Sequence, residues 1–304
     1  MISPPTRHLR IDPKLLDRLK GVELKSRFLV RGLYNSRHRT GDRGSSTEFI
    51  EHREYRWGDE IRSIAWRILG RTDRMYVKVH EMEANMRVHL VLDSSASMRV
   101  PPPAGLPGKL DLAAVVAGAL AILAEGQQDS VGLLCLGDRI EQAIPARQGK
   151  AHLRLLLEHL AAPRGQGGGR FGELVFQSGA HLGTRAMVLL LTDALDDPES
   201  LLRAMKHLRA RQHDVGLVQI LDRNEIEFPF DRLAEFRHPE SGARLIGDPA
   251  LLRSNYLRRL QAHLDRVQAC CRKAQADYLL LDNAADLGRL LAMHLVRRAM
   301  RRAR

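Results

Sequence analysis

The sequence is poor in cysteine and contains no long apolar run. Its three cysteines, Cys135, Cys270 and Cys271, are too few for a disulfide scaffold and lack the CxxC spacing of a zinc site. The longest apolar run, residues 112–124, has 13 residues, whereas a membrane-spanning helix needs about 20. The first residues lack the apolar core and cleavage site of a signal peptide. We therefore expect a cytoplasmic protein without a transmembrane segment.

Aromatic residues make up only 5% of the chain, which leaves few rings to stack on nucleic-acid bases. The net charge of +12 is concentrated at the two ends. Residues 1–80 carry 18 lysines and arginines against 10 acidic residues, and residues 249–304 carry 12 against 4. Nucleic acid is therefore not the expected partner. Binding of nucleic acid or an anionic surface through the basic ends, including the Arg-rich residues 297–304, stays an alternative function.

From residue 86 onward, apolar blocks of strand length alternate with helical patterns, which is typical of a βαβ succession. This alternation predicts an α/β domain over residues 86–304, with a mainly parallel sheet and helices on both faces. The expected strands cover residues 86–92, 130–136, 140–143, 186–192, 215–221 and 278–281. The expected helices cover residues 109–125, 153–160, 198–208 and 249–273, with another beginning near residue 171 and a basic one from residue 284. Residues 223–248 are predicted to be an irregular insertion.

Residues 1–85 have a different pattern and are predicted to form an N-terminal extension. They contain a helical pattern at residues 13–19, a stretch rich in Gly, Ser and Arg, and a strand pattern near residues 76–79. Because they contain few large apolar residues, we expect them to pack on the α/β domain rather than to form a core of their own.

Polar side chains follow two of the predicted strands. Asp93, Ser95 and Ser97 come directly after the first strand, and Asp193 follows the strand at residues 186–192. Open α/β sheets bind ligands at the carboxyl ends of their strands, so these side chains are expected to converge. Carboxylate and hydroxyl oxygens suit Mg²⁺, with Ca²⁺ or Mn²⁺ as alternatives. The sequence therefore predicts a metal site, unless the aspartate and the serines only cap the following segment and satisfy backbone donors.

Two motifs carry a resemblance to known families. The strand, the Asp-x-Ser-x-Ser loop and the later Leu-Thr-Asp resemble the von Willebrand factor A fold with its metal-ion-dependent adhesion site. Residues 53–66 carry Arg-x-Tyr-x-x-Gly-Asp-x-x-Arg-x-Ile-x-Trp upstream of the Asp-x-Ser-x-Ser-Met of residues 93–98. This signature is similar to that of the domain-of-unknown-function 58 family. The resemblance spans roughly residues 32–281 and implies a von Willebrand factor A-like, Rossmann-like fold.

The resemblance also implies a function. Genes of that family are commonly found beside genes of MoxR-type AAA+ ATPases, so the implied role is a non-catalytic, chaperone-like adaptor. It would bind such a motor and help it mature a client protein complex. Asp93, Ser95, Ser97 and Asp193 match metal positions of the von Willebrand pattern. A protein partner, bound through a metal-bridged carboxylate, is thus the primary expectation.

The chain departs from both family patterns. The von Willebrand pattern has a threonine in the loop before the third helix, where this chain has Gly-Gly-Gly-Arg-Phe at residues 167–171. The site is therefore either weakened for Mg²⁺ or metal-free. Arg170 is a candidate to bring a positive charge to the position of the cation. Ala65 stands where related sequences have an aspartate.

Charged and aromatic side chains are interleaved in the N-terminal signature, which contains Arg53, Tyr55, Trp57, Asp59, Arg62 and Trp66. Guanidinium groups can pair with carboxylates and stack on aromatic rings. Such a network either ties the extension to the α/β domain or forms a docking surface for the ATPase or its client. Buried tryptophan rings favour the first interpretation and exposed rings the second.

No catalytic motif accompanies the strand-end aspartate. A haloacid-dehalogenase-like phosphatase needs a second carboxylate two residues after its nucleophile, and Ser95 stands at that position. The sequence has no Gly-x-Ser-x-Gly elbow and no phosphate-binding Gly-Lys-Ser/Thr, and its 13 histidines show no metal-ligand spacing. We expect a protein without enzymatic activity, and a metal-dependent hydrolase stays an alternative.

Overall fold

The computed structural model describes Ser26 and residues 49–55, 66–72, 74–80, 86–161, 167–168 and 170–284. The chain divides into two compact units, one of Met1–Ser36 with Met86–Arg304 and the other of Arg37–Asn85. Each unit has β-structure of its own. Ser26 belongs to the first unit, so this division differs from an extension that runs unbroken over residues 1–85.

A six-stranded sheet forms the centre of the larger unit, with the strand order β10-β7-β6-β3-β4-β5. Within this sheet, β5 is antiparallel to its neighbour β4, and all other neighbours are parallel. The strand bounds are β3 Arg87–Asp93, β4 Ser130–Leu136, β5 Ile140–Arg147, β6 Met187–Thr192, β7 Asp214–Leu221 and β10 Asp277–Asp282. The apolar runs of β3 and β6 are buried because both faces of the sheet are covered.

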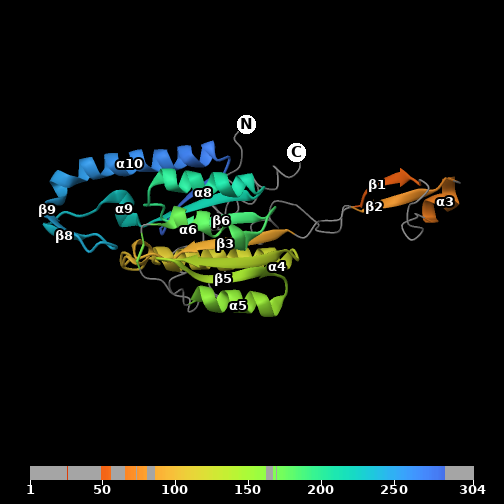
Figure 1. The fold of residues 1–304 in the computed structure, drawn as a ribbon, viewed down its shortest axis with the longest axis horizontal. Helices are drawn as coiled ribbons and strands as arrows, with labels where there is room; N and C mark the ends of the chain where they lie inside the picture. The colour runs from red at the N-terminus through yellow and green to blue at the C-terminus, as the bar shows by residue number, and fades with distance from the viewer. Residues whose placement is uncertain are drawn as a thin grey trace, which may run out of the picture. The chain divides into compact units, whose positions relative to one another are not determined.

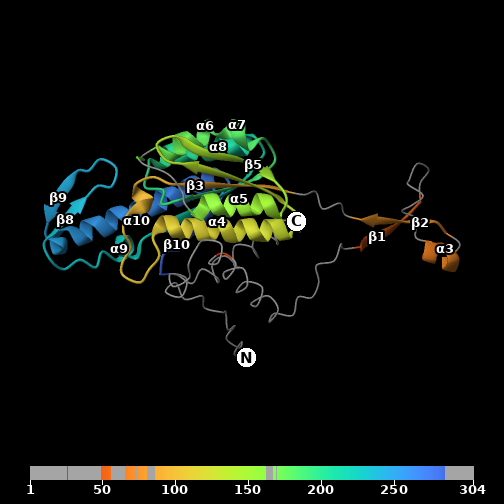
Figure 2. The same ribbon diagram turned by 90° about the horizontal axis from the view of Figure 1, so that it is seen from below.

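Helices lie on both faces of this sheet (Figures 1 and 2). One face packs against α4 (Lys109–Gly126) and α5 (Lys150–Ala161), and the other against α6 (Phe171–Gln177), α8 (Pro198–Ala210) and α10 (Pro249–Lys273). The short α7 (Gly179–Leu182) follows α6. The mainly parallel α/β fold that the sequence predicts from residue 86 onward is confirmed.

Helix α4 is buried on nearly all sides because it lies between the sheet and α5. Ser26 also packs on it, since the Ser26 hydroxyl donates a hydrogen bond to the carbonyl oxygen of Val115 at 3.0 Å. A Cβ atom added at Gly118 would lie 2.4 Å from that hydroxyl, so glycine permits this close approach. Among the described helices, α4 included, none is long and apolar enough to cross a membrane.

Residues 223–248 differ from the irregular insertion that the sequence suggests. They contain the short helix α9 (Arg223–Glu227) and an antiparallel hairpin of β8 (Ala234–Arg237) and β9 (Arg244–Gly247). An aromatic cluster stabilises these short elements: Phe228, Phe230, Phe236 and Tyr256 pack with ring centroids between 4.7 and 5.6 Å apart. Packing across this cluster, rather than strand periodicity, therefore accounts for the hairpin.

The smaller unit contains β1 (Phe49–Glu54) and β2 (Tyr76–His80), which pair antiparallel, with α3 (Trp66–Thr72) between them along the chain. The strand predicted near residues 76–79 is confirmed as β2, whereas β1 and α3 were not predicted. The helices predicted at residues 13–19 and beyond residue 284 lie outside the described residues.

Candidate functional site

Residues 93–97, called the adhesion loop below, leave the carboxyl end of β3 at the centre of the sheet. Ser94 holds this loop to the end of β4, because its backbone N–H and its hydroxyl both donate to the carbonyl oxygen of Leu136, at 2.8 and 3.1 Å. The loop then enters a 3₁₀ turn, Ser97–Arg99. Asp93, Ser95 and Ser97 are at most 5% exposed, so the loop is part of the protein interior.

Both carboxylate oxygens of Asp93 accept hydrogen bonds within the fold. Oδ1 accepts from the backbone N–H of Ser95 at 3.0 Å. Oδ2 accepts from the hydroxyl of Thr192 at 2.5 Å, and Thr192 in turn accepts from the backbone N–H of Ala194 at 2.9 Å. Thr192 thus connects the ends of β3 and β6, a role that the sequence analysis missed although it recognised the Leu-Thr-Asp motif.

The structure brings the four predicted site residues together. The hydroxyl oxygens of Ser95 and Ser97 share a hydrogen bond at 3.0 Å. Asp193 follows β6 and is 2% exposed. Burial and the nearby charge of Asp193 raise the pKa of Asp93 to about 7, so the two carboxylates are close enough to interact. All four residues therefore lie at the carboxyl edge of the sheet, where β3 and β6 end.

Lys109, the first residue of α4, is an additional member of this cluster. Its side chain is fully buried, and its ammonium lies 3.0 Å from Oδ2 of Asp193 and 2.6 Å from Oε1 of Glu225. Burial alone lowers the pKa of Lys109, but the carboxylates of Asp193 and Glu225 outweigh burial and raise it above its ordinary value. Lys109 is therefore a charged ammonium inside the protein, in contact with a predicted metal-site aspartate.

Glu225 is held in place by the N-terminus of α9. Its second carboxylate oxygen accepts from the backbone N–H of Asp222 at 2.8 Å, while the Asp222 side chain accepts from the backbone N–H of Asn224 at 2.8 Å. This reciprocal capping box fixes the first turn of α9. Asn283 adds a further connection, donating to Asp222 at 2.7 Å and to the carbonyl oxygen of Pro107 at 3.1 Å. The ends of β7, β10 and α4 are thereby joined around the Lys109 ion pairs.

The carboxylate oxygens that a divalent cation needs are already engaged by donors of this chain. Both oxygens of Asp93 accept hydrogen bonds, and Asp193 accepts from Lys109 and from the backbone N–H of Leu195 at 3.3 Å. Among the described residues, no group of three His, Cys, Asp or Glu side chains is arranged to hold a metal, a set of residue types that does not include the serine hydroxyls. As arranged here, Asp93 and Asp193 bind donors of this chain.

The glycine-rich segment lies against the adhesion loop. The backbone N–H of Ala96 donates to the carbonyl oxygen of Gly167 at 2.7 Å. A Cβ atom added at Gly168 would lie 2.2 Å from Oε1 of Glu240 and 3.0 Å from Cβ of Ser95. Glu240, from the turn between β8 and β9, therefore reaches the adhesion loop where the von Willebrand pattern places a threonine. This contact was not predictable from local pattern, because residues 223–248 show no periodic pattern.

Arg170 does not supply the positive charge of this cluster. Its side chain is exposed and pairs with Glu173 at 2.8 Å on the outer surface of α6. The suggestion that Arg170 brings a positive charge to this cluster is therefore wrong, and the buried ammonium there belongs to Lys109. A lysine at the start of an otherwise apolar helix was the available signal.

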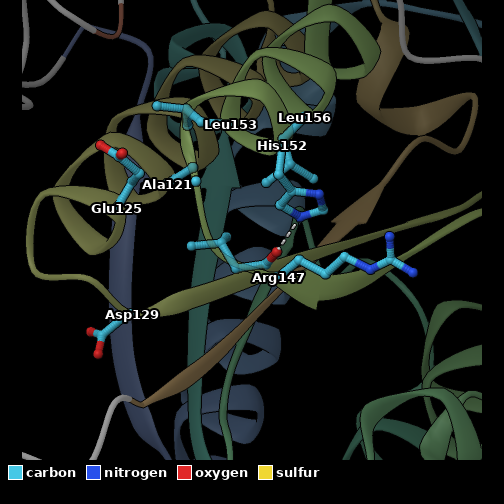
Figure 3. Close-up of a pocket in the computed structure, with 9 residues that line it drawn as sticks. Ala121, Glu125, Asp129, Arg147, His152, Leu153 and Leu156 are labelled. Atoms are coloured by element: carbon cyan, nitrogen blue, oxygen red, sulfur yellow. Dashed lines mark hydrogen bonds between the residues drawn. The ribbon is translucent and has the colours of Figure 1, made fainter.

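The surface depression in Figure 3 offers no competing site. It lies between α4, α5 and the amino end of β4, with Glu125, Asp129, Arg147 and His152 around it. His152 hydrogen-bonds the carbonyl oxygen of Val131 at 2.8 Å. Asp129 and Arg147 point away from each other in Figure 3, so its charged groups do not converge on a common point.

One known protein family matches most of this chain. The family described as "Protein of unknown function DUF58" matches residues 51–266. The chain belongs to the DUF58 family. The uncharacterized proteins Mb1516 of Mycobacterium bovis and Rv1480 of Mycobacterium tuberculosis are each 29% identical to this DUF58 chain over 291 residues, covering 92% of it and 90% of their own length. The resemblance that the sequence carries to this family is thereby confirmed.

Solved structures similar to this DUF58 chain include two proteins of low sequence identity. Conserved hypothetical protein BatB from Bacteroides thetaiotaomicron is 16% identical, with a TM-score of 0.47 over 71% of this chain and 99% of that one. The SpRpn10 VWA domain is 12% identical, with a TM-score of 0.38 over 68% of this chain and 93% of that one.

The DUF58 signature falls in the smaller unit and is described in part. Tyr55 is partly buried, and its backbone N–H donates to the carbonyl oxygen of Met75 at 2.9 Å. Trp66 is 61% exposed at the start of α3. Arg53 lies in β1, and the predicted Trp57, Asp59 and Arg62 lie outside the described residues.

Among the described residues of the adhesion loop, no serine hydroxyl hydrogen-bonds a histidine, and the hydroxyl of Ser94 is 3.1 Å from a carboxylate oxygen of Glu141. Ser95 and Ser97 hydrogen-bond each other rather than a histidine. The cysteines Cys135, Cys270 and Cys271 are buried and unpaired, and burial raises the pKa of Cys135 and Cys271 to about 12. Thiolate chemistry is therefore disfavoured, and the cluster is suited to structure and recognition.

Proposed function

We propose that this DUF58 protein is a non-catalytic adaptor that binds a MoxR-type AAA+ ATPase and connects it to a client protein complex. The observation that carries the proposal is an exposed aliphatic surface beside the adhesion loop. Four side chains form this hairpin surface and are between 56% and 79% exposed: Leu233, Leu245, Ile246 and Leu251.

The hairpin surface belongs to one local structure. Leu245 and Ile246 are consecutive residues of β9, which pairs with β8, so their side chains project from opposite faces of the hairpin. Leu251 lies in the first turn of α10, and this turn packs closely on β9, since a Cβ atom added at Gly247 would lie 2.8 Å from Leu252. Several aliphatic side chains this exposed on one hairpin and the adjoining helix end are typical of a protein-binding region.

The hairpin also connects this surface to the adhesion loop. Glu240 lies in the turn between β8 and β9 and contacts Gly168, beside Ser95. A partner bound to the hairpin surface is therefore next to the predicted adhesion site. Family membership supports the choice of an ATPase of the MoxR type. The lack of a serine–histidine pair among the described residues of the adhesion loop supports an adaptor rather than an enzyme.

The test is the affinity of the purified full-length protein for the MoxR-type ATPase of the same genome. Ile246→Asp should weaken binding at least about ten-fold, because an exposed anchor becomes a charge that must be desolvated. Leu155→Asp is the matched control, since Leu155 is 41% exposed on α5, away from the hairpin, and should bind like wild type.

Equal affinity of wild type and Ile246→Asp would show that the hairpin surface is not the interface. Absence of any binding of the ATPase to wild type would reject the proposed partner. Binding of nucleic acid that weakens by orders of magnitude as salt rises would instead favour the alternative function of the basic ends.

A further inference from the structure

The cation of the adhesion loop is part of the chain itself. Lys109 contributes a fully buried ammonium that contacts Asp193 at 3.0 Å and Glu225 at 2.6 Å. We infer that Lys109 is the resident cation of the adhesion loop, and that this loop takes no divalent ion. The inference rests on the proposed function, because it specifies that the adaptor recognises its partner at this edge without a metal bridge.

Charge compensation is the first argument. Asp193 is 2% exposed and the side chain of Glu225 is 22% exposed, so both carboxylates need an internal cation in order to stay charged. The Lys109 ammonium meets both, and buried lysines are stable when they are paired in this way. A divalent ion on Asp193 would place two positive charges beside this ammonium, and the repulsion would disfavour it.

The second argument is that the oxygen atoms predicted to bind a metal already form hydrogen bonds. Octahedral Mg²⁺ needs several oxygen atoms directed at one point. Both oxygens of Asp93 and both oxygens of Asp193 accept hydrogen bonds from other groups of the chain. The hydroxyls of Ser95 and Ser97 hydrogen-bond each other.

Access to the loop is the third argument. A carboxylate from another protein reaches a bound metal only where one coordination position faces solvent. Asp93, Ser95, Ser97 and Asp193 are at most 5% exposed and Lys109 is 0% exposed. Glu240 also lies close to Ser95, over the backbone of Gly168. The cluster is therefore a closed internal ion-pair network, and a partner contacts the surfaces around it.

The network also joins the adhesion loop to the hairpin. Glu225 accepts from Lys109 through one oxygen and from the backbone of Asp222 through the other, which fixes α9. The chain continues from α9 through Phe228 to β8, the first strand of the hairpin. Lys109 thus acts as a positioning residue for the proposed partner surface rather than as a contact of its own.

Manganese titration of the full chain, followed by electron paramagnetic resonance, tests the inference without any partner. Wild type should show no Mn²⁺ site tighter than about 1 mM that is lost in the double variant Ser95→Ala/Ser97→Ala. Lys109→Met removes the internal cation and should gain a Mn²⁺ site at least about ten-fold tighter than any in wild type, because two buried carboxylates then lack a counter-charge. Mn²⁺ should raise the Tm of Lys109→Met and leave that of wild type unchanged.

A wild-type Mn²⁺ site that the double serine variant loses would overturn the inference. This arm needs no lysine variant, so it decides the question even where Lys109→Met does not fold. A folded Lys109→Met protein without added Mn²⁺ affinity would also overturn it. Failure of the ATPase to bind would reject the proposed function but leave the metal titration unaffected, so the two failures are distinguishable.

Discussion

Two buried polar clusters lie at opposite ends of the same sheet, and they bury their polar atoms in different ways. At the carboxyl end, the carboxylates of Asp93 and Asp193 accept hydrogen bonds through both oxygens, and Lys109 supplies a positive charge. Toward the amino end, the rings of His89 and His213 are at most 3% exposed. Nδ1 of His89 and Nε2 of His213 have no hydrogen-bond partner among the described residues.

The two histidines are buried in their neutral form, without a counter-charge. Burial, together with the charges of His213 and Arg87, lowers the pKa of His89 to about 4. Burial also lowers the pKa of His213. One end of the sheet therefore retains its charges by pairing them, whereas the other remains neutral at physiological pH. The difference teaches that Lys109 compensates charge at the carboxyl end, while burial keeps the histidines at the amino end neutral, and both ends respond to pH.

The largest expected effect comes from removing Lys109. Lys109→Met should lower the free energy of unfolding by about 3–5 kcal/mol, because it leaves Asp193 and Glu225 without their buried partner. Lys150→Met is the matched control, since Lys150 begins α5 and is exposed, and it should change stability by less than about 0.5 kcal/mol. Urea unfolding measures both.

Neutralising the carboxylates sharpens this prediction. Adding Asp193→Asn and Glu225→Gln to Lys109→Met should recover part of the lost stability, because the uncompensated charges are removed with the cation. If Lys109→Met unfolds at the same urea concentration as Lys150→Met, the ion pairs make no net contribution, and the contrast between the two ends of the sheet is wrong.

The fold was predictable where local patterns specify it. Alternating apolar blocks predicted β3, β4, β6 and β7, and the helical pattern over residues 249–273 predicted α10. In the structure, Asp248 caps α10 and Pro249 lies in its first turn. The strands β8 and β9 have only four residues each. They depend on contacts of Phe228 with rings that are distant in sequence, so local pattern carries too little information to predict them.

The site was predictable only where its residues end strands. Asp93 and Asp193 each follow an apolar strand, and parallel strands bring their carboxyl ends to one edge. Lys109 and Glu225 are 116 positions apart and begin helices or lie in a short one, where a charged side chain ordinarily faces solvent. Glu240 belongs to an unpredicted turn. Their convergence depends on the completed tertiary fold and cannot be read from spacing.

The pH dependence of stability should have opposite signs at the two ends. Asp93 has a folded pKa of about 7, above its ordinary 3.8, so it contributes stability that is complete below pH 3.8 and is lost as pH rises toward 7. His89 has a folded pKa of about 4, below its ordinary 6.5, so its contribution is complete above pH 6.5 and is lost as pH falls toward 4. Between these values the two slopes oppose each other, each reaching at most about 1.4 kcal/mol per pH unit.

Removing one group at a time should uncover the opposing slopes. Relative to wild type, the stability of Asp93→Asn should increase as pH rises from 4.5 to 6.5, and that of His89→Leu should decrease over the same range. The difference between each variant and wild type isolates the titrating group from the other carboxylates. Urea unfolding at three pH values measures the slopes, and parallel curves for all three proteins would contradict the assignment.

The smallest expected effect compares a glycine near each cluster. A Cβ atom at Gly132 would lie 2.9 Å from Nδ1 of His89 and 2.9 Å from two backbone atoms of β5. Those backbone atoms are fixed by pairing between β4 and β5, so Gly132→Ala should cost about 1–3 kcal/mol. At Gly168 the closest atom is the carboxylate end of Glu240, which can rotate away, so Gly168→Ala should cost less than about 1 kcal/mol.

A double variant tests whether the side chain of Glu240 causes the cost of Gly168→Ala. Adding Glu240→Ala should remove most of the cost of Gly168→Ala, because the remaining neighbour, Cβ of Ser95 at 3.0 Å, needs to shift only slightly. Gly126→Ala is the control, since nothing lies within 4 Å of the added atom, and its helical position favours alanine slightly. Thermal unfolding of the four variants measures the order. If Gly168→Ala lowers stability as much as Gly132→Ala, the side chain of Glu240 cannot move away from Gly168. The turn between β8 and β9 is then held rigidly against the adhesion loop.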